Sequence, residues 1–265
     1  MRIDVVTLFP EALEGPLGHS ILGRAVEKGL VDIRLWNLRE FTDDPHRTAD
    51  DAPYGGGAGM VLKPEPFFKA AETIFADWGT REASRVLLTT PQGRVFDQEF
   101  AEELGDSERL LVLCGHYESV DERVREHLVT DEVSIGDYVL TGGELAAAVI
   151  IDATVRLLPG VVGEGDSTVM ESFSGFLLEH PHYTRPAEFK GWRVPDVLLS
   201  GHHEEVRRWR LKMALKRTLE RRADLLEATE LTGEEQALLD EIGQELEAQA
   251  EQPNGGPEDG RYQSD

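Results

Sequence analysis

Three short glycine-bearing segments hold the residues best suited to contact a ligand. They are Thr90-Pro91-Gln92-Gly93, the run from Cys114 to Glu118, and SIGDYVLTGGE from Ser134 to Glu144. Each follows a run typical of a strand, and ligands of α/β proteins bind outside the carboxyl ends of the strands. Glycines there let backbone amides and carbonyls approach a ligand closely. Together the three segments predict a pocket for a nucleotide-like molecule.

Other common ligand chemistries find little support. No segment matches the phosphate-binding pattern GxxxxGK[ST], and none combines GxGxxG with an acid at the proper distance. The single cysteine, Cys114, excludes an intrachain disulfide and a cysteine zinc cluster within one protomer. Because Cys114 ends an apolar run, we interpret it as a small buried thiol. Five histidines could suggest a metal site, but their spacing fits no zinc-binding pattern. They are His46, His180, His182, His202 and His203.

The elements that must position the three segments alternate along the first 160 residues. Runs typical of strands cover residues 3–9, 31–38, 85–90, 110–114 and 132–135. Helical patterns cover residues 20–28, 65–78, 98–104, 120–128 and 144–158. This alternation predicts an α/β layer with a largely parallel sheet. The helix 144–158 is apolar nearly all round, so we expect it to be buried, in part against a partner chain.

The remainder of the chain has a different organisation. Pro159-Gly160 ends the apolar helix, and the following stretch has no clear periodicity, so we interpret it as a linker. Helices are expected at 204–222 and 232–250, the second opened by a capping box of Thr232 and Glu235. We therefore divide the chain into a cofactor-binding domain (1–160), a linker (161–175), a helical domain (176–250) and a disordered tail (251–265).

Charge is distributed unevenly along this 265-residue chain, whose formal net charge is -24. Residues 185–222 hold 11 Lys and Arg against 5 acids, whereas residues 223–265 hold 13 acids and one Arg. Salt screens distant charge beyond about 8–10 Å, so the basic segment can still form a phosphate-binding face. A solvated helix face with internal ion pairs is the alternative. The sequence has no signal peptide and no apolar run that could span a bilayer, which predicts a cytoplasmic protein.

Four long motifs give the sequence a specific resemblance. They are HRTADDAPYGGGAGM (His46 to Met60), SIGDYVLTGGE, PHYTRP (Pro181 to Pro186) and VLLSGHHEEVRRWR (Val197 to Arg210). In this order they closely resemble the bacterial tRNA (guanine-N1)-methyltransferase family, TrmD, of the SPOUT superfamily. The similarity runs from Met1 to about Glu227.

The resemblance implies a fold that general rules would miss. Patterns alone favour an open doubly wound sheet, because knots are rare. The family instead has an α/β fold with a parallel sheet tied into a deep trefoil knot, plus a small helical carboxyl-terminal domain. Two protomers form a homodimer with each active site at the subunit interface. The knotted loops bind S-adenosylmethionine, which carries over to Thr90, Pro91, Gly93, Gly115, Tyr117, Glu118, Ile135, Gly136, Asp137, Tyr138, Val139, Leu140, Gly142 and Gly143.

The family's reaction methylates N1 of the guanosine at tRNA position 37, 3′ of the anticodon. Guanine N1 carries a proton at neutral pH, so a base must remove it while charge on O6 is stabilised. The resemblance assigns the second role to Arg156. The family's usual base is an Asp before Ser-Phe, but this sequence reads VMESF, so we expect Glu171 to be the base, with Asp166 as the alternative.

Further residues follow from the same resemblance. His116 stands where many relatives have Arg, and Ser119 where many have Gly. The reaction is expected to depend on magnesium, whose ligands we do not assign. Contact with the target base is expected from Asp50, Gly57 and Gly59. Contact with tRNA phosphates is expected from a basic helix that carries Arg207, Arg208, Arg210, Lys212, Lys216 and Arg217.

Two other functions remain open from the sequence. The Glu at position 171 is compatible with an RNA-binding protein that has lost transfer chemistry, although Arg156 and the three cofactor segments are retained. A SPOUT methyltransferase acting on rRNA is the other alternative. The motifs PHYTRP and SGHHEEVRRWR favour the tRNA enzymes over it.

Overall fold

The computed structural model describes residues 1–80, 82–162, 172–173, 177–227 and 230–250. It divides into two compact units, Met1–Ser167 and Thr168–Asp265. The expected linker and the expected tail fall largely or wholly outside the described residues.

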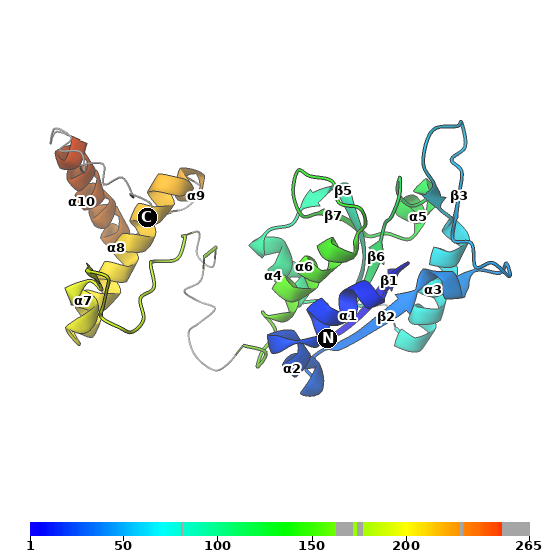
Figure 1. The fold of residues 1–265 in the computed structure, drawn as a ribbon, viewed down its shortest axis with the longest axis horizontal. Coiled ribbons are helices and arrows are strands. Elements are labelled where there is room, and N and C mark those ends of the chain that lie inside the picture. The colour runs from blue at the N-terminus through cyan, green and yellow to red at the C-terminus, as the bar shows by residue number, and fades with distance from the viewer. Residues whose placement is uncertain (81, 163–171, 174–176, 228–229, 251–265) are drawn as a thin grey trace, which may run out of the picture. The chain divides into compact units, whose positions relative to one another are not determined.

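A parallel five-stranded sheet forms the centre of the first unit (Figure 1). Its spatial order is β2-β1-β6-β5-β7, and every neighbouring pair is parallel. The strands are β1 (Arg2–Thr7), β2 (Asp32–Asn37), β5 (Ser84–Val95), β6 (Arg109–Cys114) and β7 (Asp131–Ser134). The expected strands are therefore confirmed, but β5 continues past Thr90 to Val95.

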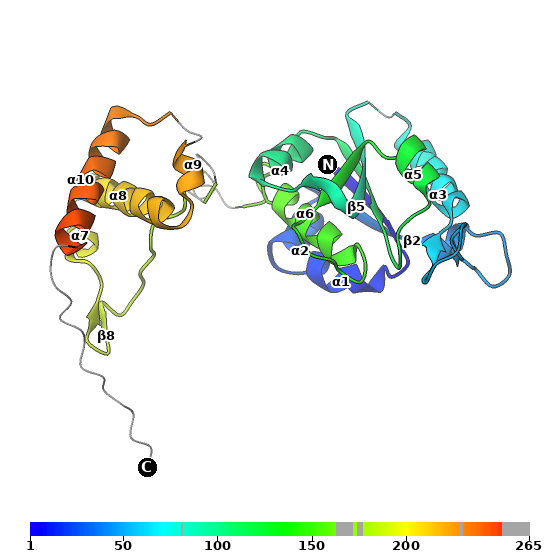
Figure 2. The same ribbon diagram turned by 90° about the horizontal axis from the view of Figure 1, so that it is seen from above.

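Helices cover both faces of this sheet (Figure 2). On one face lie α1 (Glu11–Gly18), α2 (Ser20–Glu27), α4 (Gln98–Gly105) and α6 (Glu144–Val155). On the other lie η1 (Leu38–Phe41), α3 (Pro64–Trp78) and α5 (Glu122–His127). Because strand side chains alternate, Leu110 and Val112 enter the first apolar layer while Leu111 and Leu113 enter the second. This explains why β6 reads as a continuous apolar run.

The helix α6 is not buried on all sides within the described chain. Ala147, Ile150 and Ile151 are fully buried, but Leu145 and Val149 are 58% and 48% exposed. The helix also ends at Val155 rather than at residue 158. One apolar stripe of α6 therefore remains open to solvent in the single chain.

A short hairpin projects from the first unit. It consists of β3 (Asp50–Asp51) and β4 (Val61–Leu62), with Asp50 opposite Leu62. The glycine-rich segment 52–60 forms its loop, which extends away from the sheet (Figure 1).

The second unit is built around two helices, α8 (His203–Arg221) and α10 (Gly233–Ala250). Leu215, Leu238 and Ile242 form its buried core. The capping box is confirmed, since Thr232 N donates to Glu235 Oε2 at 2.7 Å and Glu235 N donates to Thr232 Oγ1 at 3.3 Å. The unit also contains α7 (Asp196–Leu199), α9 (Ala223–Glu227) and the antiparallel pair β8 (Glu188–Phe189) and β9 (Trp192–Arg193).

Candidate active site

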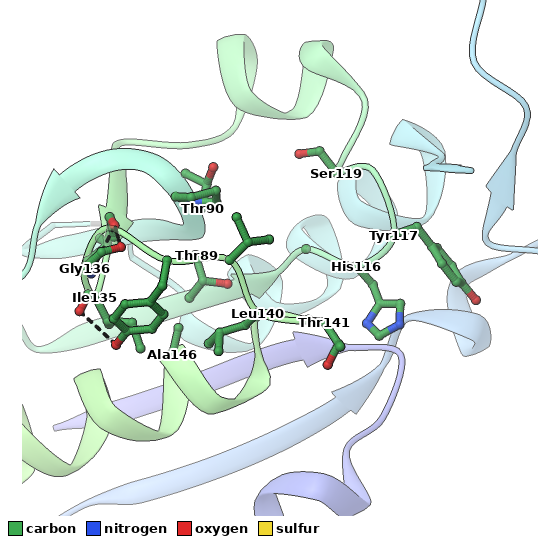
Figure 3. A pocket seen from close by; sticks show the side chains of 18 of the residues that line it. Thr89, Thr90, His116, Tyr117, Ser119, Ile135, Gly136, Leu140, Thr141 and Ala146 are labelled. Atoms are coloured by element: carbon green, nitrogen blue, oxygen red, sulfur yellow. Dashed lines mark hydrogen bonds between the residues drawn. The ribbon is translucent and has the colours of Figure 1, made fainter. Parts of the chain in front are cut away.

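A cleft lies beyond the carboxyl ends of β6 and β7 and beside the middle of β5, at Thr89 to Pro91, in the first unit (Figure 3). The cavity has a volume of about 140 Å³ and is open to solvent on one side. The three glycine-bearing segments line it together with the start of α6. Side chains or backbone come from Thr89, Thr90, Pro91, Gly115, His116, Tyr117, Glu118, Ser119, Val133, Ser134, Ile135, Gly136, Tyr138, Val139, Leu140, Thr141, Gly142, Gly143 and Ala146.

The segment 135–143 crosses from the edge strand β7 to the start of α6. At its beginning, Ser134 Oγ donates to Gly136 O at 3.1 Å, and Tyr138 Oη donates to Ile135 O at 3.1 Å. Gly136 has a φ of 142°, and a Cβ there would lie 2.7 Å from the Tyr138 ring. Only glycine fits this position without strain. The segment thereby folds its own backbone against the cleft.

The end of this segment is held under β6. Gly143 N donates to Gly115 O at 2.8 Å. A Cβ on Gly143 would overlap Thr89 Oγ1 and lie 3.0 Å from both Cys114 Cα and Gly115 N. The absence of a side chain at Gly143 is therefore what allows the returning chain to pass so close to β5 and β6.

A buried carboxylate fixes the start of α6 beneath the cleft. Glu144 is 7% exposed, and Thr7 Oγ1, at the end of β1, donates to its Oε1 at 2.5 Å. A Cβ on Gly142 would meet Glu144 Oε2 and the His116 Nδ1 atom. Burial raises the pKa of the neighbouring Cys114 thiol well above its ordinary value, and the negative charge of Glu144 adds to this rise. Cys114 is thus a structural thiol, as the sequence indicated.

His116 is the least satisfied polar side chain in the cleft. Its ring lies 5.1 Å from the Phe9 ring and 4.6 Å from the Tyr117 ring. Within the described residues and in the absence of ligand, its buried Nδ1 has no hydrogen-bond partner. An unpaired buried nitrogen of this kind is suited to receive a polar group of a ligand.

Most of the residues assigned to the cofactor lie in this cleft. Gly93 and Asp137 are the two that do not line it. A Cβ on Gly93 would overlap the backbone of Glu132 and Val133, so this glycine serves the close approach of β5 to β7. Thr89, Ser134 and Thr141 also line the cleft but were not among the residues expected from the sequence to bind the cofactor. Each directly adjoins one of those residues.

The residues expected near the target base lie on the β3–β4 hairpin. Asp50 is half-buried in β3, while Gly57 and Gly59 are exposed in the loop. The hairpin is tied to the cleft because Glu118 N donates to Met60 O at 3.1 Å. A Cβ on Gly59 would lie 2.5 Å from Glu118 Cγ. The loop therefore lies against one wall of the cleft.

Of the residues expected to act in the reaction, the structure describes the one expected to stabilise charge but not the one expected to accept the proton. Arg156 caps the carboxyl end of α6 and is half-buried. Glu171 and the alternative base Asp166 lie outside the described residues. Their assignment stays a prediction.

Three of the six basic side chains expected to contact RNA pair with acids in the second unit. Arg207 binds Glu204 and Glu234, Arg208 binds Glu241, and Lys212 binds Glu241 and Glu245. Arg217 donates to the Glu179 carbonyl at 2.9 Å. Arg210 instead lines a groove formed by residues from the PHYTRP motif, α7 and α8.

Within the described residues, no three His, Cys, Asp or Glu side chains gather closely enough to hold a metal ion. In the same part of the chain, no helix has the length and apolar character needed to cross a membrane.

Comparison with known proteins gives a consistent result. The model of a family described as tRNA (Guanine-1)-methyltransferase TrmD matches residues 1–228. A tRNA (guanine-N(1)-)-methyltransferase of Brevibacillus brevis is 60% identical over 245 residues, which covers 92% of this chain and 99% of the relative. Its counterpart in Dehalococcoides mccartyi is 55% identical, with 94% and 100% covered. The counterpart in Dictyoglomus turgidum is 56% identical, with 93% and 98% covered.

Proposed function

Since the chain belongs to the TrmD family of tRNA (guanine-N1)-methyltransferase enzymes, we propose that it transfers a methyl group from S-adenosylmethionine to N1 of the guanosine at tRNA position 37. The single observation that carries the cofactor assignment is the cleft beside the middle of β5 and beyond the carboxyl ends of β6 and β7. Its walls are glycine-bearing backbone segments, and three assigned glycines, Gly136, Gly142 and Gly143, stand where a Cβ would collide with the chain.

The chemistry of the residues that line the cleft fits S-adenosylmethionine. Backbone amides and carbonyls of 135–140 are suited to the adenine edge, and the apolar side chains of Ile135, Val139 and Leu140 are suited to the ring faces. The unpaired Nδ1 of His116 offers a polar contact within the same cleft. When bound, the cofactor supplies a methyl group that is already activated by its sulfonium.

A trefoil knot is part of the proposal. Its support is the course of the chain, which leaves β6, passes to the edge strand β7 and returns through 135–143 to Gly115 and Thr7. A homodimer is also proposed, with each active site at the subunit interface. The exposed Leu145 and Val149 of α6 supply an apolar surface of the kind a second subunit would cover.

The proposed reaction needs one residue to remove the proton from guanine N1 and another to stabilise the negative charge that develops on O6. We assign removal of the N1 proton to the carboxylate of Glu171, which differs from the usual Asp by one methylene. Arg156 is assigned to stabilise the negative charge that grows on O6. We assign contact with the base to the hairpin of Asp50, Gly57 and Gly59, which lies against the cofactor cleft through Glu118.

We propose the dependence on magnesium from the family resemblance, and within the described residues no cluster of three His, Cys, Asp or Glu side chains identifies its ligands. No step of the proposed reaction is therefore assigned to it. The tRNA itself is proposed to contact the basic residues of the second unit as well as the cleft.

The decisive experiment is nucleoside mass spectrometry. Unmodified tRNA is incubated with the full chain, S-adenosylmethionine and magnesium, then digested and analysed. The proposal predicts 1-methylguanosine. A parallel incubation uses rRNA, and tRNA binding is measured separately by filter binding. Binding of tRNA without any methylated nucleoside would instead favour a noncatalytic RNA-binding protein, and methylation of rRNA but not of tRNA would favour the other alternative.

A further inference from the structure

The second unit contains two sets of basic side chains that differ in whether a carboxylate pairs with them. The first set consists of Arg207, Arg208 and Lys212, whose charged groups all meet glutamates of α10. Lys212 is held by both Glu241 and Glu245, at 3.2 Å and 2.7 Å. These carboxylates stand where RNA phosphates would have to bind. Contact with a phosphate would require breaking each pair or bringing the phosphate beside a glutamate.

The second set has no such compensation. Arg185 and Arg210 are exposed, and within the described residues neither forms an ion pair or a hydrogen bond. Both line the same groove, with Arg185 from the PHYTRP motif and Arg210 from α8. Two guanidinium groups without carboxylate partners in one groove provide the planar donor geometry that phosphate oxygens prefer.

Aromatic rings lie in the same groove. Tyr183 is 50% exposed, and its ring is 6.4 Å from that of Trp209. The His180 and His182 rings are 4.5 Å apart. His180 is buried, which lowers the pKa of its imidazole, and the charge of Arg210 lowers it further. His180 therefore serves as a neutral ring beside the arginines and adds no charge.

Apolar side chains also line the groove, among them Val194, Leu198 and Val206. A groove that combines apolar side chains, an exposed ring and two arginines has the composition used to bind a single-stranded nucleotide, because the base can stack while its phosphate is held. A double-stranded backbone would use the arginines alone.

Resting on the proposed function, we infer that this groove binds an unpaired nucleotide of the tRNA, with a backbone phosphate on Arg185 and Arg210 and the base stacked on Tyr183. The acids of α10 compete with RNA phosphates for Arg207, Arg208 and Lys212. The face formed by Arg207, Arg208 and Lys212 then contributes little to affinity, contrary to the expectation from sequence that Arg207, Arg208, Arg210 and Lys212 act together.

Arg210 and Arg208 form a matched pair for testing this assignment. Both lie on α8, both are exposed, and conversion of either to Gln changes the net charge equally. Affinity of the full chain for unmodified tRNA is measured by filter binding over a series of salt concentrations. Arg210→Gln is expected to weaken binding about tenfold and to reduce the salt slope by about one, as for a lost phosphate contact. Arg208→Gln is expected to weaken it less than threefold.

Two further variants protect the test against local misfolding. Arg185→Gln changes a different segment of the groove and is expected to behave like Arg210→Gln. Tyr183→Ala is expected to weaken tRNA binding about fivefold or more, while Tyr183→Phe, which keeps the ring, retains the affinity. Thermal unfolding followed by circular dichroism checks that each variant is folded.

Equal losses for Arg210→Gln and Arg208→Gln, or a larger loss for Arg208→Gln, would overturn the assignment. So would full affinity in Arg185→Gln together with Tyr183→Ala. These binding measurements do not depend on methyl transfer. A wild-type protein that binds tRNA through the groove but forms no 1-methylguanosine would contradict the proposed function and not the groove.

Discussion

Thr7 donates a 2.5 Å hydrogen bond to the carboxylate of Glu144, which follows it by 137 residues. The Thr7 oxygen in turn accepts a 3.0 Å hydrogen bond from the backbone N–H of Phe9. The end of the first strand therefore holds the first residue of α6. Since α6 begins directly after the segment 135–143, this contact anchors the wall of the cofactor cleft.

Replacing Thr7 by Val should therefore destabilise the protein. The variant keeps the shape of the side chain but leaves a buried carboxylate without its donor, at a cost of about 2–3 kcal/mol. Urea unfolding measures this loss of unfolding free energy, and Thr7→Ser, which retains the hydroxyl, serves as the control. Equal stability of the Val and Ser variants would show that the hydrogen bond contributes nothing.

Gly143→Ala should abolish cofactor binding. The new methyl group would collide with Thr89 Oγ1 and crowd Cys114 and Gly115, so the segment 135–143 could no longer close against β6. Titration calorimetry with S-adenosylmethionine is expected to give at least a hundredfold weaker binding. Gly105→Ala is the matched control, because a Cβ there meets no atom within 4 Å. Unchanged affinity in Gly143→Ala would contradict the assigned cleft.

Glu171→Gln should slow the chemical step without preventing binding. The amide has the size of the carboxylate but cannot accept the N1 proton, so single-turnover methylation should fall by about 10²–10⁴-fold. Glu171→Asp, which restores the residue usual in relatives, should retain most of the rate. The same pair of substitutions at Asp166, to Asn and to Glu, tests the alternative base. A near wild-type rate in Glu171→Gln would remove this residue from the role.

Because of the buried Cys114 thiol, the free energy of unfolding is expected to fall at alkaline pH. Burial raises the pKa of its thiol in the folded state, so the folded protein keeps the proton while the unfolded chain releases it. This contribution is fully present below about pH 8.5, the ordinary thiol pKa, and falls as the pH rises above it, by about 1.4 kcal/mol per pH unit. Urea unfolding of wild type and Cys114→Ala between pH 7.5 and 9.5 should give a steeper decline for wild type. Parallel slopes would contradict it.

The fold was predictable wherever the pattern is local. Leu110 to Cys114 predicted a strand, and Thr232 with Glu235 predicted the start of α10; both are confirmed. The extension of β5 to Val95 was missed, because Arg94 and Val95 pair with Val133 and Ser134 only once the distant strand β7 is in place. Helix α1 was missed as well, since Pro16 and its glycines obscure the helical pattern.

The position of the cleft was predictable from the sequence, but the contacts that hold its walls in place were not. The glycine-bearing segments after β6 and β7 correctly indicated where a cleft would form, since strand ends of a parallel sheet share one edge. The third segment, Thr90 to Gly93, lies within β5 and does not follow it as expected. Nothing local indicated that Glu144 would meet Thr7, or that Gly93 would admit β7 rather than a ligand. The count of basic residues suggested one RNA-binding face, whereas α10 supplies acids to three of them.

The central claim is that S-adenosylmethionine bound in the glycine-lined cleft donates its methyl group to N1 of the guanine at tRNA position 37, next to the anticodon. Its most direct test uses two tRNA transcripts that differ only in having G or A at position 37, incubated with S-adenosylmethionine carrying a labelled methyl group. Mass mapping of nuclease fragments should locate the label on position 37 of the G transcript alone, as 1-methylguanosine, with none formed by Gly143→Ala. Label elsewhere in the tRNA, or equal labelling of both transcripts, would contradict the account.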